Sequence, residues 1–301
     1  MILMKKKSLA VLLAALVLCL PVLSFGETVV TSFYPIWLFT LNLTEGLEGV
    51  TVCNLTAPDT GCLHDYQLQI ADMKVLEGAD VFLINGAGME TFLPKLEAAF
   101  PDLPVVSATE GVPLLSMDGT LQIGEAESEV NAHVWLDAGR AVLMCENLAE
   151  GLKAALPDRA EAIQANLEAY RARLETLDAA LKEGLSGLSR RDIITFHEAF
   201  PYFTEAYGLR VVAVVNKEPG EAVSAAQMAE LISLIRELGN PPLFVEPQYE
   251  ELSARTLSEE TGAPVFTLDP VVTGPETEVP LDYYETVMLR NMTTLHAALG
   301  D

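Results

Sequence analysis

The chain has 301 residues, with 18 Lys and Arg against 43 Asp and Glu, and its formal net charge is -25 at pH 7. Half of the residues are hydrophobic. That share excludes a disordered chain and, at roughly 100 to 200 residues per domain, fills the cores of two domains. A surface this acidic repels nucleic-acid phosphates and anionic lipid headgroups but attracts cations. We therefore expect a cationic partner and no nucleic acid.

The N-terminal segment predicts export. Three lysines at 5–7 precede an apolar run at 9–23, and the small residues of Ser24-Phe25-Gly26 follow it. This order of basic, apolar and small residues is typical of a secretory signal peptide, here residues 1–26. The mature chain would begin near Glu27, outside the cytoplasm, in the periplasm or at the cell surface.

Two other interpretations of this segment are weaker. Lipid attachment at Cys19 is disfavoured because the bulky Leu18 precedes it and the residues that follow are still apolar. A retained membrane anchor is disfavoured because the run is shorter than the ~20 apolar residues of a spanning helix.

After the signal peptide, short β-branched runs alternate with helical patterns, which is typical of βαβ units and parallel sheets. The first set predicts strands at 28–32, 51–55, 80–85 and 104–107, and helices at 36–47, 67–77 and 90–100. The segment 116–130 is acidic and has no apolar periodicity, so it predicts a surface loop.

A long helical segment follows. Asp137 can cap a helix that reaches Leu156, Pro157 breaks it, and Asp158 can cap a second helix that reaches about Leu185. The second of these helices would span about 40 Å at 1.5 Å per residue. Its apolar residues recur every three or four positions and form one packed face: Ile163, Leu167, Tyr170, Leu174, Leu177 and Leu181. We interpret it as a rigid linker, and we hypothesise that it permits only small movements of the parts it joins.

The alternation then resumes. It predicts strands at 192–196, 210–215, 243–246 and 265–268, and helices at 199–207, 222–238, 250–261 and 282–299. The predicted fold is therefore α/β: two similar lobes, each with a four-stranded, mainly parallel sheet and flanking helices, joined by a long rigid helix. The predicted boundaries are 27–136 for the N-terminal lobe, 137–188 for the linker and 189–301 for the C-terminal lobe.

Export makes a disulfide chemically reasonable, and Cys53 and Cys62 enclose a short, turn-rich loop. We predict a bridge between them, which would stabilise the fold by roughly 2 to 3 kcal/mol. The alternative is that Cys53 is a buried strand residue and Cys62 a thiol close to a site. Cys145 lies in a helical pattern, and we predict that it is a free residue of the core.

Three of the four histidines, His64, His133 and His197, lie next to predicted strands or between elements, and Asp269 follows the last strand. Ligands of open α/β sheets bind beyond the carboxyl ends of strands. Three imidazoles and one carboxylate around an ion suit four-coordinate Zn²⁺. The alternative is that each histidine is a hydrogen-bonded structural residue; for His296 we keep that interpretation.

The sequences around these residues carry a resemblance. The motifs are Cys62-Leu63-His64-Asp65-Tyr66-Gln67, Asn131-Ala132-His133-Val134-Trp135-Leu136-Asp137, Phe196-His197-Glu198-Ala199-Phe200-Pro201-Tyr202-Phe203, Val245-Glu246-Pro247-Gln248 and Thr267-Leu268-Asp269-Pro270. In this order they resemble the motifs of the TroA-like family, the zinc- and manganese-binding solute-binding proteins of bacterial ABC importers. The resemblance covers the whole mature chain, including the opening Thr31-Ser32-Phe33-Tyr34-Pro35.

The resemblance implies a protein that captures a divalent transition metal between two lobes and delivers it to a membrane permease. We expect this protein to be a monomer. By position, His64, His133, His197 and Asp269 match the family's four metal ligands. A histidine at the third position goes with zinc, and a glutamate there goes with manganese. The adjacent Glu198 could replace His197 only by rotation of the strand end. Four protein ligands leave no open position for catalysis, so an enzyme is not expected.

The chain also departs from the family pattern. Asn131-Ala132 stands where an Asp-Pro pair is usual, and Leu63 and Gln67 replace a proline and a glutamate. The loop 116–130 is rich in histidine in many zinc-specific members, but here it contains acids and no histidine, so a metal-collecting role is not supported.

Three alternatives stay open at this point. The first is a manganese-specific protein of the same type. The second is a surface adhesion or interaction protein on the same scaffold. The third is a secreted zinc hydrolase that uses Glu198 as its base, which the missing second histidine of a His-Glu-x-x-His motif disfavours.

Overall fold

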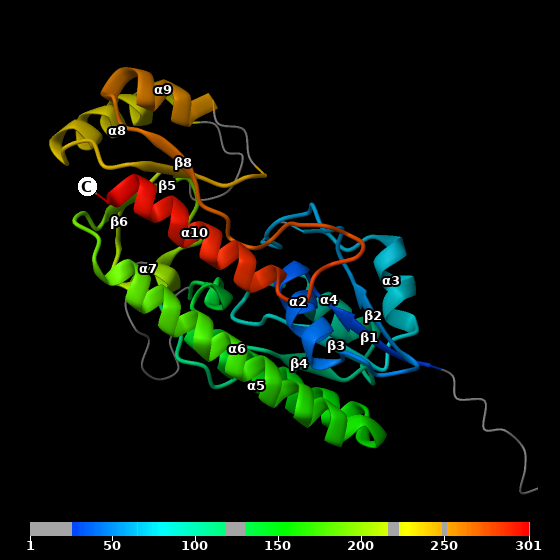
Figure 1. Ribbon diagram of the computed structural model, residues 1–301. Coiled ribbons are helices and arrows are strands. Elements are labelled where there is room, and N and C mark those ends of the chain that lie inside the picture. Colours follow the sequence, from blue (N-terminus) through cyan, green and yellow to red (C-terminus); the bar gives the residue numbers. More distant parts are fainter. Residues whose placement is uncertain (1–25, 65, 118–129, 216–222, 249–251, 301) are drawn as a thin grey trace, which may run out of the picture.

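The computed structural model describes residues 26–64, 66–117, 130–215, 223–248 and 252–300. These residues form two α/β lobes with one four-stranded sheet each, side by side along a pair of long helices (Figure 1). The predicted segments 1–25 and 118–129 lie outside the described residues. Among the described residues, no helix is long and apolar enough to cross a membrane.

The first lobe contains a parallel sheet in the order β2-β1-β3-β4. Its strands are β1 (Glu27–Thr31), β2 (Val50–Asn54), β3 (Val81–Ile84) and β4 (Val105–Ser107), and its helices are α2 (Tyr34–Leu43), α3 (Ile70–Glu77) and α4 (Leu93–Ala99). The central strand β3 is buried along its whole length, as expected for a strand covered on both faces.

Helix α4 begins three residues later than predicted. The Glu90 carboxylate turns back and accepts the backbone N–H groups of Asn85, at 2.8 Å, and Gly86, at 3.0 Å. Glu90 therefore fixes the turn at the end of β3, and Leu93 and Pro94 supply the first helical turn.

Helices α5 (Ala138–Ala155) and α6 (Ala160–Ser186) follow the short 3₁₀ turn η1 (Val134–Leu136). Asp137 caps α5 as predicted, because its side chain accepts the N–H of Gly139. The predicted cap at Asp158 is wrong. Pro157 starts a second 3₁₀ turn, η2 (Pro157–Arg159), which contains Asp158, and Arg159 occupies the cap position of α6.

The second lobe repeats the topology of the first, with a parallel sheet in the order β6-β5-β7-β8. Its strands are β5 (Asp192–Thr195), β6 (Arg210–Val214), β7 (Leu243–Val245) and β8 (Val265–Thr267), and its helices are α7 (Pro201–Tyr207), α8 (Ala225–Glu237), α9 (Leu252–Thr261) and α10 (Tyr283–Leu299). The predicted fold class is confirmed.

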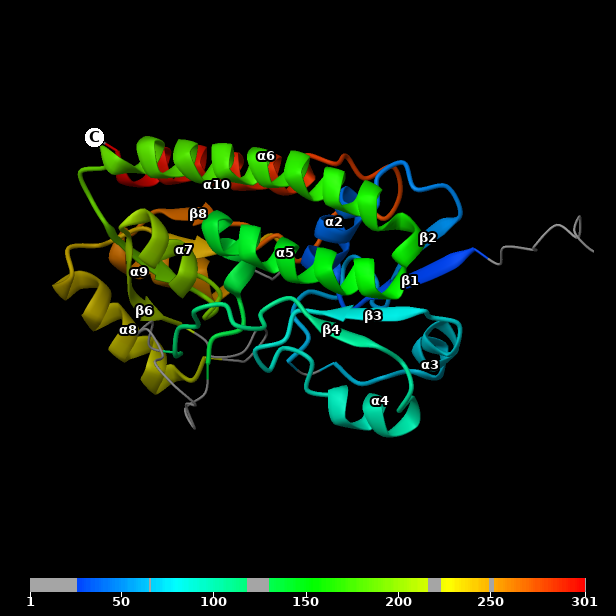
Figure 2. The same ribbon diagram turned by 90° about the horizontal axis from the view of Figure 1, so that it is seen from below.

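Helix α6 holds the two lobes together. It packs against α5, α10 and α2, and Figure 2 shows α6 and α10 running side by side along the molecule. The predicted apolar stripe is buried on one face, with Leu185 added at its end. One hydrophobic core extends from the first sheet through α5 and α6 to the inner side of the second lobe. A smaller second core lies between the second sheet and α8 and α9.

Side-chain hydrogen bonds also join the lobes. The Trp135 indole donates to the carbonyl of Pro270 at 2.8 Å, and the Tyr284 hydroxyl donates to the carbonyl of Trp135 at 2.6 Å. Trp135 directly follows His133-Val134 and is completely buried. The start of η1 is therefore fixed between the lobes, next to the carboxyl ends of both sheets.

Candidate metal centre

His133 is the central residue of the candidate site. It precedes η1, and only 2% of it is exposed. Asn131 fixes its ring, because the Asn131 Oδ1 lies 3.1 Å from His133 Nδ1 and accepts the backbone N–H of His133 at 3.0 Å. The Asn131 Nδ2 donates to the Glu198 carbonyl at 2.7 Å, which sets the orientation of the amide. Nδ1 therefore carries the proton, and Nε2 presents its lone pair to the site.

His197 reaches the same place from the second lobe, where one residue, Phe196, separates it from the end of β5. Its Nδ1 lies 2.8 Å from Glu246 Oε1, and both side chains are almost completely buried. The Gln248 Nε2 donates to the other carboxylate oxygen at 2.6 Å. A carboxylate can only accept from Nδ1–H, so the Nε2 of His197 also remains for an ion. This arrangement matches the carboxylate partners of metal-bound histidines.

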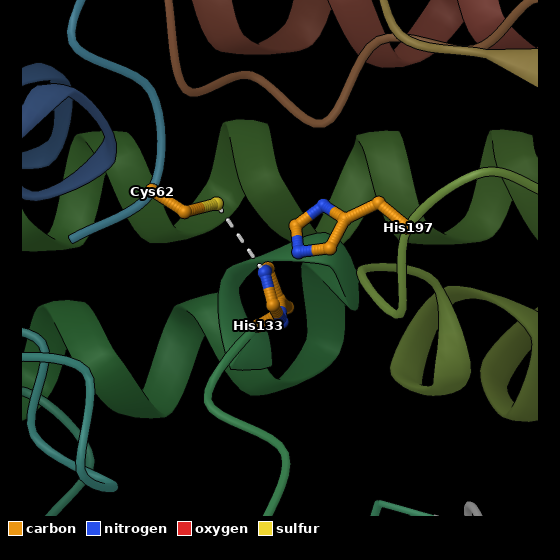
Figure 3. Close-up of side chains that lie close together, drawn as sticks. All are labelled: Cys62, His133 and His197. Atoms are coloured by element: carbon orange, nitrogen blue, oxygen red, sulfur yellow. Dashed lines mark hydrogen bonds between the residues drawn. The ribbon is translucent and has the colours of Figure 1, made fainter. Parts of the chain in front are cut away.

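Cys62 completes a compact group with these two histidines. Among the described residues, one set of His, Cys and acidic side chains has its ligand atoms all within 4.8 Å of one another: Cys62, His133 and His197. The two imidazole ring centroids are 4.8 Å apart, and Cys62 Sγ lies 3.4 Å from His133 Nε2. Figure 3 shows the three side chains converging from three segments of the chain.

The structure does not contain the predicted disulfide between Cys53 and Cys62. Cys53 lies within β2, in register with Val30 of β1. Gly61 adopts a φ of 80°, which a residue without Cβ reaches readily. The turn directs the Cys62 sulfur toward His133. The alternative interpretation from the sequence, a Cys62 thiol close to a site, agrees with this arrangement. Cys145 is free and buried, as predicted.

The other two predicted ligands, His64 and Asp269, contribute no atom to this group. The His64 ring centroid is 5.5 Å from that of His133, and the Thr91 hydroxyl donates to the His64 carbonyl at 3.1 Å. Asp269 follows β8, and its Oδ1 accepts the N–H of Val271 at 2.8 Å. The structure therefore brings two of the four predicted ligands, His133 and His197, into close contact and leaves His64 and Asp269 outside the close group.

Burial controls the ionisation of this region. Burial, and then the charges of His197 and His64, hold the pKa of His133 well below its ordinary value of 6.5. Burial also raises the pKa of the Asp269 carboxyl above its ordinary 3.8, against the opposing effects of the Val271 N–H and Arg290. The site therefore favours a neutral imidazole at His133.

The lowered pKa of His133 predicts how bound metal responds to acid. Protons compete with a metal for imidazole nitrogens. Because a proton binds the folded His133 weakly, that competition begins below the pH of 6.5 at which an ordinary histidine is half protonated. We expect half-release of one bound zinc below pH 6.5, measured as zinc content after dialysis at stepped pH. Half-release above pH 6.5 would contradict this expectation.

Two other segments with predicted roles lie partly outside the described residues. Within the acidic loop 116–130, the described residues show an antiparallel bridge between Ser116 and Val130, and the acids at 118–129 lie outside the described residues. Asp65 in the first motif lies outside them as well. The sequence did not predict that Glu246 contacts His197, although Glu246 lies in one of the motifs. The available signal was an acidic residue directly after a buried strand.

Comparisons with known proteins identify the family to which the chain belongs. The model of the family described as "Zinc-uptake complex component A periplasmic" (ZnuA) matches residues 29–298. The zinc-binding lipoprotein AdcA of Streptococcus pneumoniae is 30% identical over 276 residues, which cover 89% of this chain and 54% of AdcA. The high-affinity zinc uptake system protein ZnuA of Bacillus subtilis is 28% identical over 283 residues, covering 90% of this chain and 87% of that protein.

Solved structures give the same relationship. The crystal structure of Zn(II)-bound AdcA from Streptococcus pneumoniae has a TM-score of 0.77 at 29% identity and covers 92% of this chain and 58% of AdcA. The solute-binding protein FpvC of Pseudomonas aeruginosa, solved in complex with Mn²⁺, has a TM-score of 0.76 at 25% identity. The match covers 91% of this chain and 98% of the FpvC chain. This chain spans about half the length of the AdcA proteins that it matches.

Proposed function

Since the chain belongs to the zinc-uptake complex component A family, we propose that it captures Zn²⁺ outside the cytoplasm and delivers it to the permease of an ABC importer. The metal is cargo that is bound and released. Members of this family are solute-binding proteins, so the hydrolase alternative is set aside.

The observation that carries the proposal is the convergence of His133 and His197 from the two lobes. Both are buried, and both have Nδ1 hydrogen-bonded to an oxygen so that Nε2 is the nitrogen left for an ion. We propose His64, His133, His197 and Asp269 as the ligand set. Imidazole-rich sites suit Zn²⁺, whereas Mn²⁺ prefers more oxygen ligands. Glu246 accepts the Nδ1–H of His197, so we propose that Glu246 orients His197 and does not bind the ion.

The place of action follows from the N-terminus. We propose that residues 1–26 are a cleaved signal peptide and that the mature protein works as a monomer in the periplasm or at the cell surface, without lipid at Cys19. The intact mass of the exported protein tests this. A mass that corresponds to a start near Glu27 is expected, and a lipid-modified Cys19 at the N-terminus would overturn it.

Metal content tests the proposed function. The mature chain, stripped with a chelator and reloaded in an equimolar mixture of Zn²⁺, Mn²⁺, Fe²⁺ and Ni²⁺, should retain one zinc per chain by elemental analysis. Zn²⁺ wins many such mixtures through intrinsic affinity, so separate titrations with Zn²⁺ and Mn²⁺ should be made, and Zn²⁺ should bind more tightly. A folded protein that retains no metal would overturn the proposal and favour an adhesion protein.

Manganese is the second candidate cargo, because the similar FpvC structure was solved with Mn²⁺. Tighter binding of Mn²⁺ than of Zn²⁺ in the separate titrations would favour it. The two buried imidazoles argue against this outcome, since they offer nitrogen where Mn²⁺ prefers oxygen.

A further inference from the structure

Cys62 lies within reach of an ion held by His133 and His197. Zinc binds sulfur at about 2.3 Å and imidazole nitrogen at about 2.0 to 2.1 Å, so a sulfur and a nitrogen on one tetrahedral ion are about 3.6 Å apart. In this structure Cys62 Sγ and His133 Nε2 are 3.4 Å apart. The pair therefore already has the spacing of one edge of a zinc tetrahedron.

The backbone around Cys62 holds the sulfur in this place. Leu63 is completely buried, and the Tyr66 N–H donates to the Leu63 carbonyl at 3.1 Å to close a turn. The Gly274 N–H of the second lobe donates to the Pro58 carbonyl at 3.2 Å. These bonds anchor the loop on both sides of Cys62, so the sulfur faces the histidines through the loop's own conformation.

We propose that Cys62 Sγ is a ligand of the captured ion, together with Nε2 of His133 and Nε2 of His197. This inference rests on the proposed function and changes one of its four proposed ligands. Because a tetrahedral ion takes four ligands, the sulfur replaces one of the two candidates outside the close group, His64 or Asp269. On binding, the Sγ–H bond breaks, an Sγ–metal bond forms, and the proton leaves to solvent.

A thiolate changes which ions the site prefers. Soft sulfur ligands select Zn²⁺ and similar thiophilic ions, whereas Mn²⁺ favours carboxylate, carbonyl and water. Cys62 therefore acts as a determinant of metal specificity, in addition to the histidine at position 197. We expect Cys62→Ser to lower the ratio of Zn²⁺ to Mn²⁺ affinity by about tenfold or more.

Cobalt spectroscopy tests the sulfur ligand directly. Co²⁺ bound by a thiolate gives a near-ultraviolet charge-transfer band that nitrogen and oxygen ligands do not give. The reduced mature wild-type protein and Cys53→Ser should both show this band with one equivalent of Co²⁺. Cys62→Ser should bind Co²⁺ without it. Cys53 is the matched control, because it is also a partly exposed cysteine but belongs to β2 and not to the group.

A second measurement uses the wild-type protein alone. Bound Zn²⁺ should protect Cys62, but not Cys53, from alkylation by iodoacetamide. Cobalt binding without a charge-transfer band, or equal alkylation of Cys62 with and without Zn²⁺, would overturn the sulfur ligand and leave Cys62 as a hydrogen-bonded neighbour of His133. A wild-type protein that binds neither Co²⁺ nor Zn²⁺ would instead overturn the proposed function.

Discussion

Replacement of His133 with alanine should reduce zinc affinity at least about 100-fold. Zinc sites in small peptides bind with about 10 to 16 kcal/mol, or roughly 3 kcal/mol for each of four ligands, and 1.4 kcal/mol is a factor of ten. His133 also touches both other members of the close group, since its ring lies against His197 and its Nε2 against Cys62. Isothermal titration with Zn²⁺ and a competing chelator measures the loss.

The fold should survive this change. Asn131 Oδ1 keeps its bond to the backbone N–H of residue 133, and Trp135 keeps its bond to Pro270. The matched control is His296→Ala, on the exposed side of α10, which should bind zinc as the wild type does. If a folded His133→Ala variant bound one zinc with unchanged affinity, the assignment of the site would be wrong.

The second large effect is expected at Glu246, which touches no ion but holds His197. Glu246→Gln keeps an oxygen that can accept Nδ1–H at the observed 2.8 Å, but it removes the negative charge that makes the imidazole a better donor to metal. Loss of such a partner lowers metal affinity about 10- to 100-fold. Because the geometry is kept, the stoichiometry should remain one zinc per chain while the dissociation constant rises.

Glu260→Gln is the control for charge alone. Glu260 is an exposed residue of α9 in the same lobe and pairs loosely with Arg236 at 3.9 Å. The Glu260→Gln substitution should leave zinc affinity unchanged. If Glu246→Gln behaved in the same way, Glu246 would be a structural partner of His197 without influence on the metal.

The sequence predicted the fold well because each lobe is built from local patterns. Strands β1 to β8 lie within or close to the predicted β-branched runs, and the buried stripe of α6 matches the three-and-four spacing that predicted it. The start of α4 differed because the Glu90 side chain bonds back to the backbone of Asn85 and Gly86 at the end of β3. Such a bond between a side chain and the nearby backbone leaves no periodic signal in the sequence.

The site was predictable in part. The strand-end position of His197, the position of His133 at the entry to the linker and the resemblance indicated these two residues, and the structure places their rings 4.8 Å apart. The partnership of Glu246 with His197 and the direction of the Cys62 sulfur were not predictable, because both depend on how separate segments pack. Closeness in sequence favoured a bridge between Cys53 and Cys62, but the turn at Gly61 points the sulfur elsewhere.

The four-ligand set of His64, His133, His197 and Asp269 stays a prediction, and so does the division into segments 27–136, 137–188 and 189–301. The signal peptide at 1–26, the absence of lipid at Cys19 and the monomeric state are predictions as well.

The two hydrophobic cores have a consequence for how the protein unfolds. The larger core crosses both lobes, so the lobes should not melt one after the other. The smaller core has five buried members, Ile194, Ile235, Leu243, Leu257 and Ala263, and it packs α8 and α9 against the second sheet. Regions with few buried contacts open first. Amide hydrogen exchange should therefore be faster in α8 and α9 than in α5 and α6, and this flank would loosen while the cleft residues His133 and His197 stay in place.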